Sequence, residues 1–192
     1  MRWRRKQTPT SPTVDATTPD AQARDARSPD VQAPDAAGPE AADSEQDGGQ
    51  VLRDLSRVVE QFGWAVLHGG GAPGDPRWSH TVGLTGLGHP EVIVVGLPFE
   101  AGETYLNLVG EAVRAGARFT PGTTTTALTD ADSPVVFLPV SDTGRLAVAE
   151  QFYGSVEALQ LVWPDSAGTL PWEDGHRNPP QAQPLLGPRP DA

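Results

Sequence analysis

The first fifty residues contain almost no side chain that a folded core could bury. Only Met1, Trp3, Val14 and Val31 are large and apolar, and the rest is mainly Ala, Pro, Asp, Thr and Gln. A segment so poor in apolar surface cannot offset the entropy lost when its backbone is ordered. The sequence therefore predicts a disordered, acidic, Ala/Pro/Asp-rich tail over residues 1–48, and any folded core must come from the residues after it.

The acidic residues of the tail are also regularly spaced. An acidic residue recurs every five positions from Asp15 to Glu40, and four of these acids directly follow a proline. Proline disfavours helix, and regularly spaced like charges keep a chain expanded. We interpret the tail as a spacer, with a solubilising arm or a docking tail as the alternatives.

From Val51 onward, apolar residues follow the periods of regular structure. A helix is predicted over 51–62, ended by Gly63, and further helices over 102–115 and 145–153. The face of the first helix expected to be buried carries Leu52, Leu55, Val59 and Phe62. Strands are predicted where apolar and β-branched residues alternate or cluster. The predicted strands span 64–68, 78–84, 91–97, 123–128, 135–140 and 158–163.

This order is helix, three strands, helix, two strands, helix and strand. Three consecutive strands argue against a doubly wound parallel sheet. The expected fold class is α+β: a single domain over residues 49–188, with a mixed, mostly antiparallel sheet and two or three helices. About 140 residues are enough to bury a full hydrophobic core.

Charge and cysteine content narrow the function classes. Residues 1–50 carry nine acidic and six basic residues, and residues 51–192 carry 16 acidic and eight basic, which together give the net charge of −11. This balance argues against nucleic acid as a partner, because phosphates require clustered Lys and Arg.

No apolar run is long enough to span a membrane, and no apolar segment follows the basic N-terminus as in a secretory signal. The absence of cysteine excludes a thiolate zinc site and a thiol nucleophile. We expect a cytoplasmic protein.

Three segments resemble one known family. They are Trp78–Thr85 with Gly88–Glu91, then Gln160–Asp165 with Gly168, Pro171, Trp172 and Glu173, and finally Gln183–Gly187. In this order and spacing they resemble the bacterial domain-of-unknown-function family 4262, over residues 51–188. The resemblance implies a fold unit and no assigned activity. Family members usually carry an aromatic residue, commonly Tyr, where this chain has His80, so the resemblance implies no family-wide catalytic role for His80.

His89, Glu91 and Asp165 are the candidates for catalysis. A histidine can act as a base near neutral pH, and a carboxylate can orient it or share a metal with it. Each residue also has a structural interpretation: His89 as a turn residue, Glu91 as the start of a strand, and Asp165 as a turn carboxylate that binds backbone N–H groups. Their spacing matches no helical metal motif. The sequence predicts no metal site and identifies no cofactor.

Trp78, His80, Trp163 and Trp172 are the candidates for ligand binding. A tryptophan offers a large flat face and one N–H donor, so it can form a pocket wall or anchor an irregular segment. Two hypotheses follow. The first is a non-catalytic module that binds a small molecule or a protein. The alternative is a metal- or flavin-assisted enzyme in which His89, Glu91 and Asp165 meet in one concave pocket. The absence of a complete catalytic motif favours the first.

Overall fold

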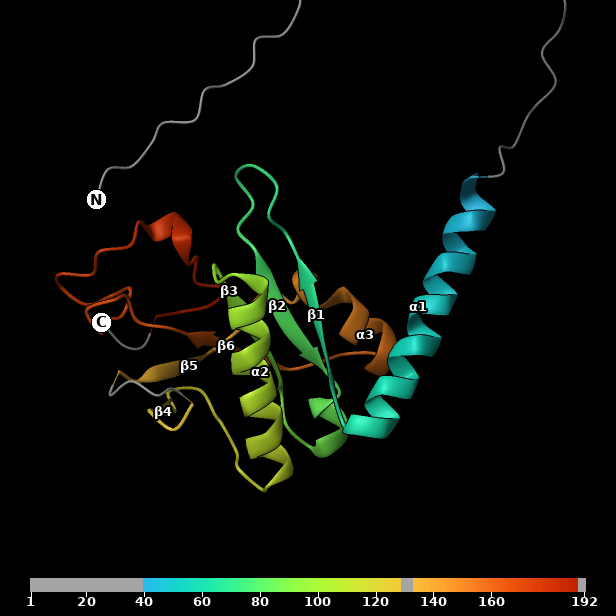
Figure 1. Cartoon of the computed structure of the whole chain (residues 1–192), viewed down its shortest axis with the longest axis horizontal. Coiled ribbons are helices and arrows are strands. Elements are labelled where there is room, and N and C mark those ends of the chain that lie inside the picture. The colour runs from blue at the N-terminus through green and yellow to red at the C-terminus, as the bar shows by residue number, and fades with distance from the viewer. Residues whose placement is uncertain (1–39, 129–132, 190–192) are drawn as a thin grey trace, which may run out of the picture. The chain divides into compact units, whose positions relative to one another are not determined.

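The computed structural model describes residues 40–128 and 133–189, with side chains described from Gly49 onward. The predicted tail lies outside the described residues up to position 39. Helices and strands occur in the predicted order (Figure 1). The helices are α1 (Glu40–Phe62), α2 (Phe99–Arg114) and α3 (Ala147–Tyr153), and the strands are β1 (Ala65–Gly69), β2 (Trp78–Val82), β3 (Glu91–Val95), β4 (Thr124–Thr125), β5 (Val135–Pro139) and β6 (Ala158–Val162). Short 3-10 helices span Leu84–Leu87, Gly144–Leu146 and Pro180–Ala182.

Within the described residues, the six strands form one mixed sheet in the order β1-β2-β3-β6-β5-β4. Every neighbouring pair is antiparallel except β3 and β6, where Glu91 lies beside Ala158 and Val94 beside Leu161. The predicted α+β class with a mixed, mostly antiparallel sheet is therefore confirmed. β3 is buried along its whole length, as expected of the most apolar run in the chain.

Helices cover both faces of the sheet. Leu106, Val109 and Val113 of α2 share a core with Val92 and Val94 on one face. Leu55 of α1 and Ala149 of α3 share a second core with Ile93 and Val95 on the other face. This arrangement follows from the alternation of strand side chains between the two faces. Figure 1 shows α2 in front of the sheet, α3 behind it, and α1 on the side of β1.

The segment after β6 covers the rest of the second face. Leu170, Trp172 and Leu185 pack against Val136 and Val162 of the neighbouring strands β5 and β6. The described part of this segment contains no strand and only one 3-10 turn, in keeping with its high content of Pro and Gly. Within residues 40–128 and 133–189, no helix has both the length and the apolar character required to cross a membrane.

α1 differs from the predicted helix in two ways. It begins at Glu40 instead of Val51, so the predicted boundary at residue 48 falls inside the helix. Ala, Glu and Gln between positions 40 and 46 favour helix, and this propensity outweighs the paired glycines that follow. Phe62, which was predicted to be buried, is 51% exposed. It is the last residue of α1 and lies about two turns after the buried Leu55 on the same side of the helix, but its side chain remains half exposed.

Candidate functional site

His89 connects two distant parts of the chain. Its Nδ1–H donates to the carbonyl of Pro90 at 2.7 Å, and its Nε2 accepts the N–H of Phe119 at 3.0 Å. These partners assign the neutral tautomer with the proton on Nδ1. Burial is the main cause that lowers the pKa of His89, and nearby Arg118 acts in the same direction. Both ring nitrogens are thus already occupied by backbone groups.

Glu91 holds the turn that follows β2. Its side chain is fully buried and accepts hydrogen bonds from the hydroxyls of Thr81 and Thr85 and from the backbone N–H groups of Gly83 and Thr85, at 2.6–3.0 Å. The N–H of Leu84 lies at 3.4 Å from the same carboxyl group. A carboxyl group surrounded by donors in this way fixes a turn, and none of its oxygen atoms faces an open site.

Asp165 organises the segment after β6. It accepts the N–H groups of Ala167, Thr169 and Arg177 at 2.8–3.0 Å, and the ring of His176 lies 3.9 Å away. The Thr169 N–H is the largest cause that lowers the pKa of Asp165, and the other two N–H groups and His176 act in the same direction. This is the turn interpretation of Asp165, with one additional partner twelve positions along the chain.

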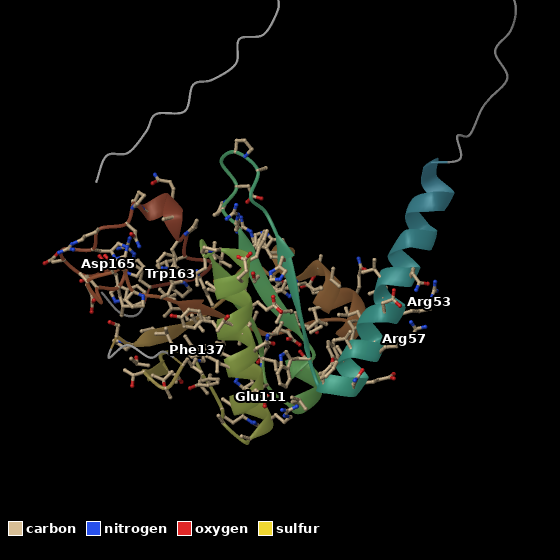
Figure 2. The ribbon with its side chains drawn as sticks, in the orientation of Figure 1. Arg53, Arg57, Glu111, Phe137, Trp163 and Asp165 are labelled. Carbon is tan, nitrogen blue, oxygen red and sulfur yellow. The ribbon has the colours of Figure 1, made fainter. Side chains whose placement is uncertain are left out.

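The structure does not bring His89, Glu91 and Asp165 together. Glu91 begins β3 beside the start of β6, whereas Asp165 follows the opposite end of β6. Figure 2 shows Asp165 and Trp163 on the opposite side of α2 from α1. Within the described residues, no group of three or more His, Cys, Asp or Glu side chains is placed to hold a metal ion. The cluster on which the enzyme hypothesis depended is not assembled.

The candidate ligand-binding residues lie in two places. Trp78 and His80 are neighbours on one face of β2, with ring centroids 5.5 Å apart. His80 is 1% exposed, its Nδ1–H donates to the carbonyl of Thr81, and burial is the main cause that lowers its pKa. Trp78 lies against Gly69, where a Cβ atom would approach its ring to 2.1 Å.

Trp163 and Trp172 hold the C-terminal segment. The indole N–H of Trp163 donates to the carbonyl of Val95 at 2.8 Å, and the backbone of Trp163 exchanges two hydrogen bonds with the side chain of Gln183. Trp172 packs against the core that contains Leu170 and Leu185. These contacts correspond to the anchoring role of tryptophan that was the alternative to a pocket wall.

A groove that none of the candidate residues lines runs beside β1. It has a volume of about 780 Å³ and is bounded by α1 on one side and α2 on the other, and we call it the β1 groove. Its lining comprises Val51, Asp54, Leu55, Val58 and Phe62 from α1, residues 64–67 at β1, and Glu103, Asn107, Glu111 and Arg114 from α2.

The two walls of the β1 groove differ in chemistry. The α1 wall is apolar apart from Asp54, and Val51, Val58 and Phe62 on it are 49%, 39% and 51% exposed. The α2 wall is polar and carries the exposed carboxylates of Glu103 and Glu111. Figure 2 shows Arg53 and Arg57 on the side of α1 that faces away from the sheet, so the charges of this helix lie mainly outside the groove.

One end of the groove is fixed by Trp64. Its indole N–H donates to Asn107 at 3.1 Å, its ring lies against Gly110, and the guanidinium of Arg114 lies 5.2 Å above it. Arg114 in turn is ion-paired with Glu111. A Cβ atom at Gly110 would approach the Trp64 ring to 2.2 Å, so only glycine permits this contact.

The other end is fixed by His68. Its Nδ1 is hydrogen-bonded to the hydroxyl of Ser79 at 2.7 Å, and its Nε2 lies 3.9 Å from Glu103. The ring of Phe99 packs against His68 with centroids 5.0 Å apart. Both ends of β1 are therefore held to α2, so the groove is formed before any partner arrives.

The sequence interpretation placed no binding residue in the β1 groove. The available signal was the pair Val51 and Val58, seven residues apart, which broadens the apolar face of α1 that already carries Leu55 and Phe62. A sequence pattern alone does not distinguish a broad buried face from one whose border stays open.

The sequence model of one family, described as "Domain of unknown function (DUF4262)", matches residues 58–177, which is 120 of the 192 residues. The matched range contains all six strands, α2, α3 and the last residues of α1. No curated protein and no solved structure matches the chain. The chain therefore belongs to the DUF4262 family of domains of unknown function.

Proposed function

We propose that this domain is a non-catalytic binding module that holds an apolar segment of another protein in the β1 groove. The observation that carries the proposal is the half-exposed row of Val51, Val58 and Phe62 along a preformed groove. Large apolar side chains gathered in a groove with a polar rim are typical of protein interaction sites.

Covering Phe62 alone would supply a useful part of a binding free energy. An aromatic side chain buries about 150–250 Å², so its exposed half amounts to about 100 Å². At about 25 cal/mol per Å² this corresponds to about 2.5 kcal/mol as an upper bound. Val51 and Val58 lie on the same helix face and would add to it.

Binding of a nucleic acid, a membrane or a small molecule, and catalysis, have less support from the residues of this domain. The lining of the β1 groove carries three acidic side chains and one basic one, which favours a protein over a nucleic acid or an anionic membrane surface. The groove is open along a strand, which suits a chain segment better than a small molecule. The oxygen and nitrogen atoms of His89, Glu91 and Asp165 are taken up by internal hydrogen bonds, which weakens the enzyme alternative.

We also place this activity in the bacterial cytoplasm. A chain without cysteine does not depend on an oxidising compartment for disulfides. A formal net charge of −11 supports solubility as a free protein.

A displayed library of random peptides of about twelve residues tests the proposal. The full chain is the bait, and Phe62→Glu is the variant that places a charge in the groove. Leu108→Glu is the matched control, because Leu108 is 43% exposed on α2 but does not line the groove. Both variants must retain the circular dichroism and melting temperature of the parent protein.

We expect a family of related peptides that the parent and Leu108→Glu enrich and Phe62→Glu does not. If no peptide family is enriched, or if Phe62→Glu enriches the same peptides, the β1 groove is not the binding site and the proposed function is wrong.

A further inference from the structure

One edge of β1 presents unpaired backbone groups to the groove. Directly before β2, the carbonyl of Arg77 accepts the N–H of Gly96, which follows β3. In β2 itself, the odd-numbered residues therefore direct their backbone groups toward β3 and the even-numbered residues toward β1. The even-numbered residues pair with residues 65, 67 and 69 of β1. Val66 and His68 occupy the positions of this ladder that are not hydrogen-bonded, so their N–H and C=O groups point away from β2. No backbone hydrogen bond of the turns, loops or caps in the described part of the chain uses these groups.

This edge lacks the usual protection against further pairing. In many proteins a Lys, a Pro, a β-bulge or a very short strand prevents an exposed edge from pairing with another chain. At the opposite edge of the sheet, β4 contains only Thr124 and Thr125. β1 reads Ala-Val-Leu-His-Gly, with no Lys or Pro, and pairs regularly with β2 over all five residues. Of these two edges, β1 is the one able to accept another strand.

A strand added at β1 would place alternate side chains against the two walls. Val66 belongs to the core beneath α2, whereas Ala65 and Leu67 belong to the core that contains Leu55 of α1. The added strand continues the same two faces. One set of its side chains would meet the apolar α1 wall, and the alternate set would meet the polar α2 wall.

The spacing of the α2 wall matches that of a strand. Glu103, Asn107 and Glu111 lie four residues apart, which corresponds to about 6 Å per step along a helix. Alternate strand residues are separated by about 6.6 Å. Glu103 lies near His68 at the end of β1, and Glu111 is ion-paired to the arginine that covers Trp64 at its start. The two carboxylates thus flank the length of β1.

From these observations we propose that the occupant of the groove is an extended segment of another protein that pairs with β1 as a seventh strand of the sheet. Its side chains alternate, with apolar residues facing α1 and Arg or Lys, four positions apart, facing Glu103 and Glu111. This inference rests on the proposed function and specifies the partner's chemistry.

A second copy of this chain fits less well. Paired through its own β1, it would offer only Val66 and His68 to the α2 wall, with no Lys or Arg among its strand residues. A two-fold pairing would also bring the carboxylates of Glu103 and Glu111 in one copy near the same carboxylates in the other copy. Like charges placed opposite one another oppose such an association.

The test titrates the full chain with a ten-residue peptide in which two Arg, four positions apart, flank two Val, with Thr elsewhere. A series of the same peptide carries one N-methylated amide at each position in turn, which removes a single backbone donor and leaves the protein unchanged. Isothermal titration gives the Kd of each peptide. We expect N-methylation to weaken binding at least tenfold at alternate positions and less than threefold at the positions between them.

Charge variants of α2 test the second part of the proposal. Glu103→Lys should weaken binding of the Arg peptide at least tenfold and should have little effect on a peptide with Gln in place of Arg. Glu100→Lys is the matched control, because Glu100 is an exposed acid of α2 outside the groove lining. Equal effects of Glu103→Lys and Glu100→Lys would overturn the assignment of the basic side chains to the α2 wall.

The remaining outcomes separate this inference from the proposed function. If library peptides bind in a Phe62-dependent way, but show no alternation on N-methylation or are not joined by the designed peptide, strand addition is overturned and the proposed function stands. If the chain is a dimer in solution that Phe62→Glu dissociates, the occupant is a second copy and the inference is wrong. If no peptide binds in a Phe62-dependent way, both fail together.

Discussion

Replacing Glu91 with Ala should destabilise the domain severely, because the side chain of Glu91 is fully buried and its carboxyl group is the acceptor for several donors of one turn. It accepts hydrogen bonds from the hydroxyl of Thr81 at 2.6 Å, the hydroxyl of Thr85 at 2.9 Å, and the backbone N–H groups of Gly83 and Thr85 at 3.0 Å. The substitution leaves four donors without an acceptor in the turn between β2 and β3.

The expected loss of unfolding free energy follows from the cost of leaving each of these buried donors without an acceptor. A buried donor without a partner costs about 1–3 kcal/mol, and we take the lower value because the two hydroxyls can rotate and water can enter the vacated space. Four donors then give a loss of about 4 kcal/mol, against a total stability of about 5–15 kcal/mol for a domain. Glu91→Gln keeps one acceptor oxygen but turns an amide NH₂ toward N–H groups, so we expect a smaller loss of about 2 kcal/mol.

Urea unfolding of the full chain, followed by tryptophan fluorescence, measures both variants. With a slope of about 2 kcal/mol per M, a loss of 4 kcal/mol lowers the midpoint by about 2 M. Glu157→Ala is the control, because Glu157 is exposed and uses only its backbone carbonyl to bind the N–H of Glu91. If both Glu91 variants unfold within 0.5 kcal/mol of the control, as surface substitutions do, the turn does not depend on Glu91 and its side chain is available for chemistry.

Three further predictions concern other parts of the domain. Burial lowers the pKa of His89, so as the pH falls below about 6.5 the unfolded chain takes up a proton before the folded one does, and stability decreases; His89→Gln should reduce the difference in melting temperature between pH 7.5 and pH 5.5. Gly110→Ala should cost about 1–3 kcal/mol in urea unfolding, because a Cβ atom there would lie 2.2 Å from the Trp64 ring. Phe62→Ala should lower the stability by no more than about 2.5 kcal/mol, since only half of the side chain is buried, and should weaken peptide binding at least tenfold in the titration; unchanged peptide binding would contradict this.

The order of helices and strands could be predicted because each element depends on the pattern of residues that are neighbours in the sequence. The buried strand β3 is a continuous apolar run, and the interior of α2 repeats apolar residues at three and four positions. The start of α1 was not predicted, because the residues before Val51 lack the large apolar side chains on which the prediction of a helix depended, although Ala, Glu and Gln between positions 40 and 46 favour helix. The strand order, in which β6 inserts between β3 and β5, depends on contacts between residues far apart in the chain and was not predicted.

The roles of the candidate residues were predictable only where their partners are near in sequence. Asp165 binds N–H groups two and four positions ahead, which is the turn interpretation that the sequence already offered. His89 binds the N–H of Phe119, thirty positions away, and no local pattern indicates that pairing. Reactive residue types mark places where chemistry is possible, but at His89 and Glu91 the fold uses the same atoms to satisfy buried backbone groups.

The acidic side chains of the groove and the open edge of β1 act together on which chains can pair with the sheet. An unprotected strand edge beside an apolar wall invites pairing with any extended apolar chain, including another copy of the same protein. Glu103 and Glu111 line the groove next to that edge, and the chain as a whole carries a net charge of −11. Copies of the chain therefore repel each other at the site where their edges would pair, and the same carboxylates attract a segment that carries Arg or Lys. On the proposed function, negative charge thus performs the task that an edge lysine or proline performs elsewhere, while leaving the backbone of Val66 and His68 accessible to the intended partner.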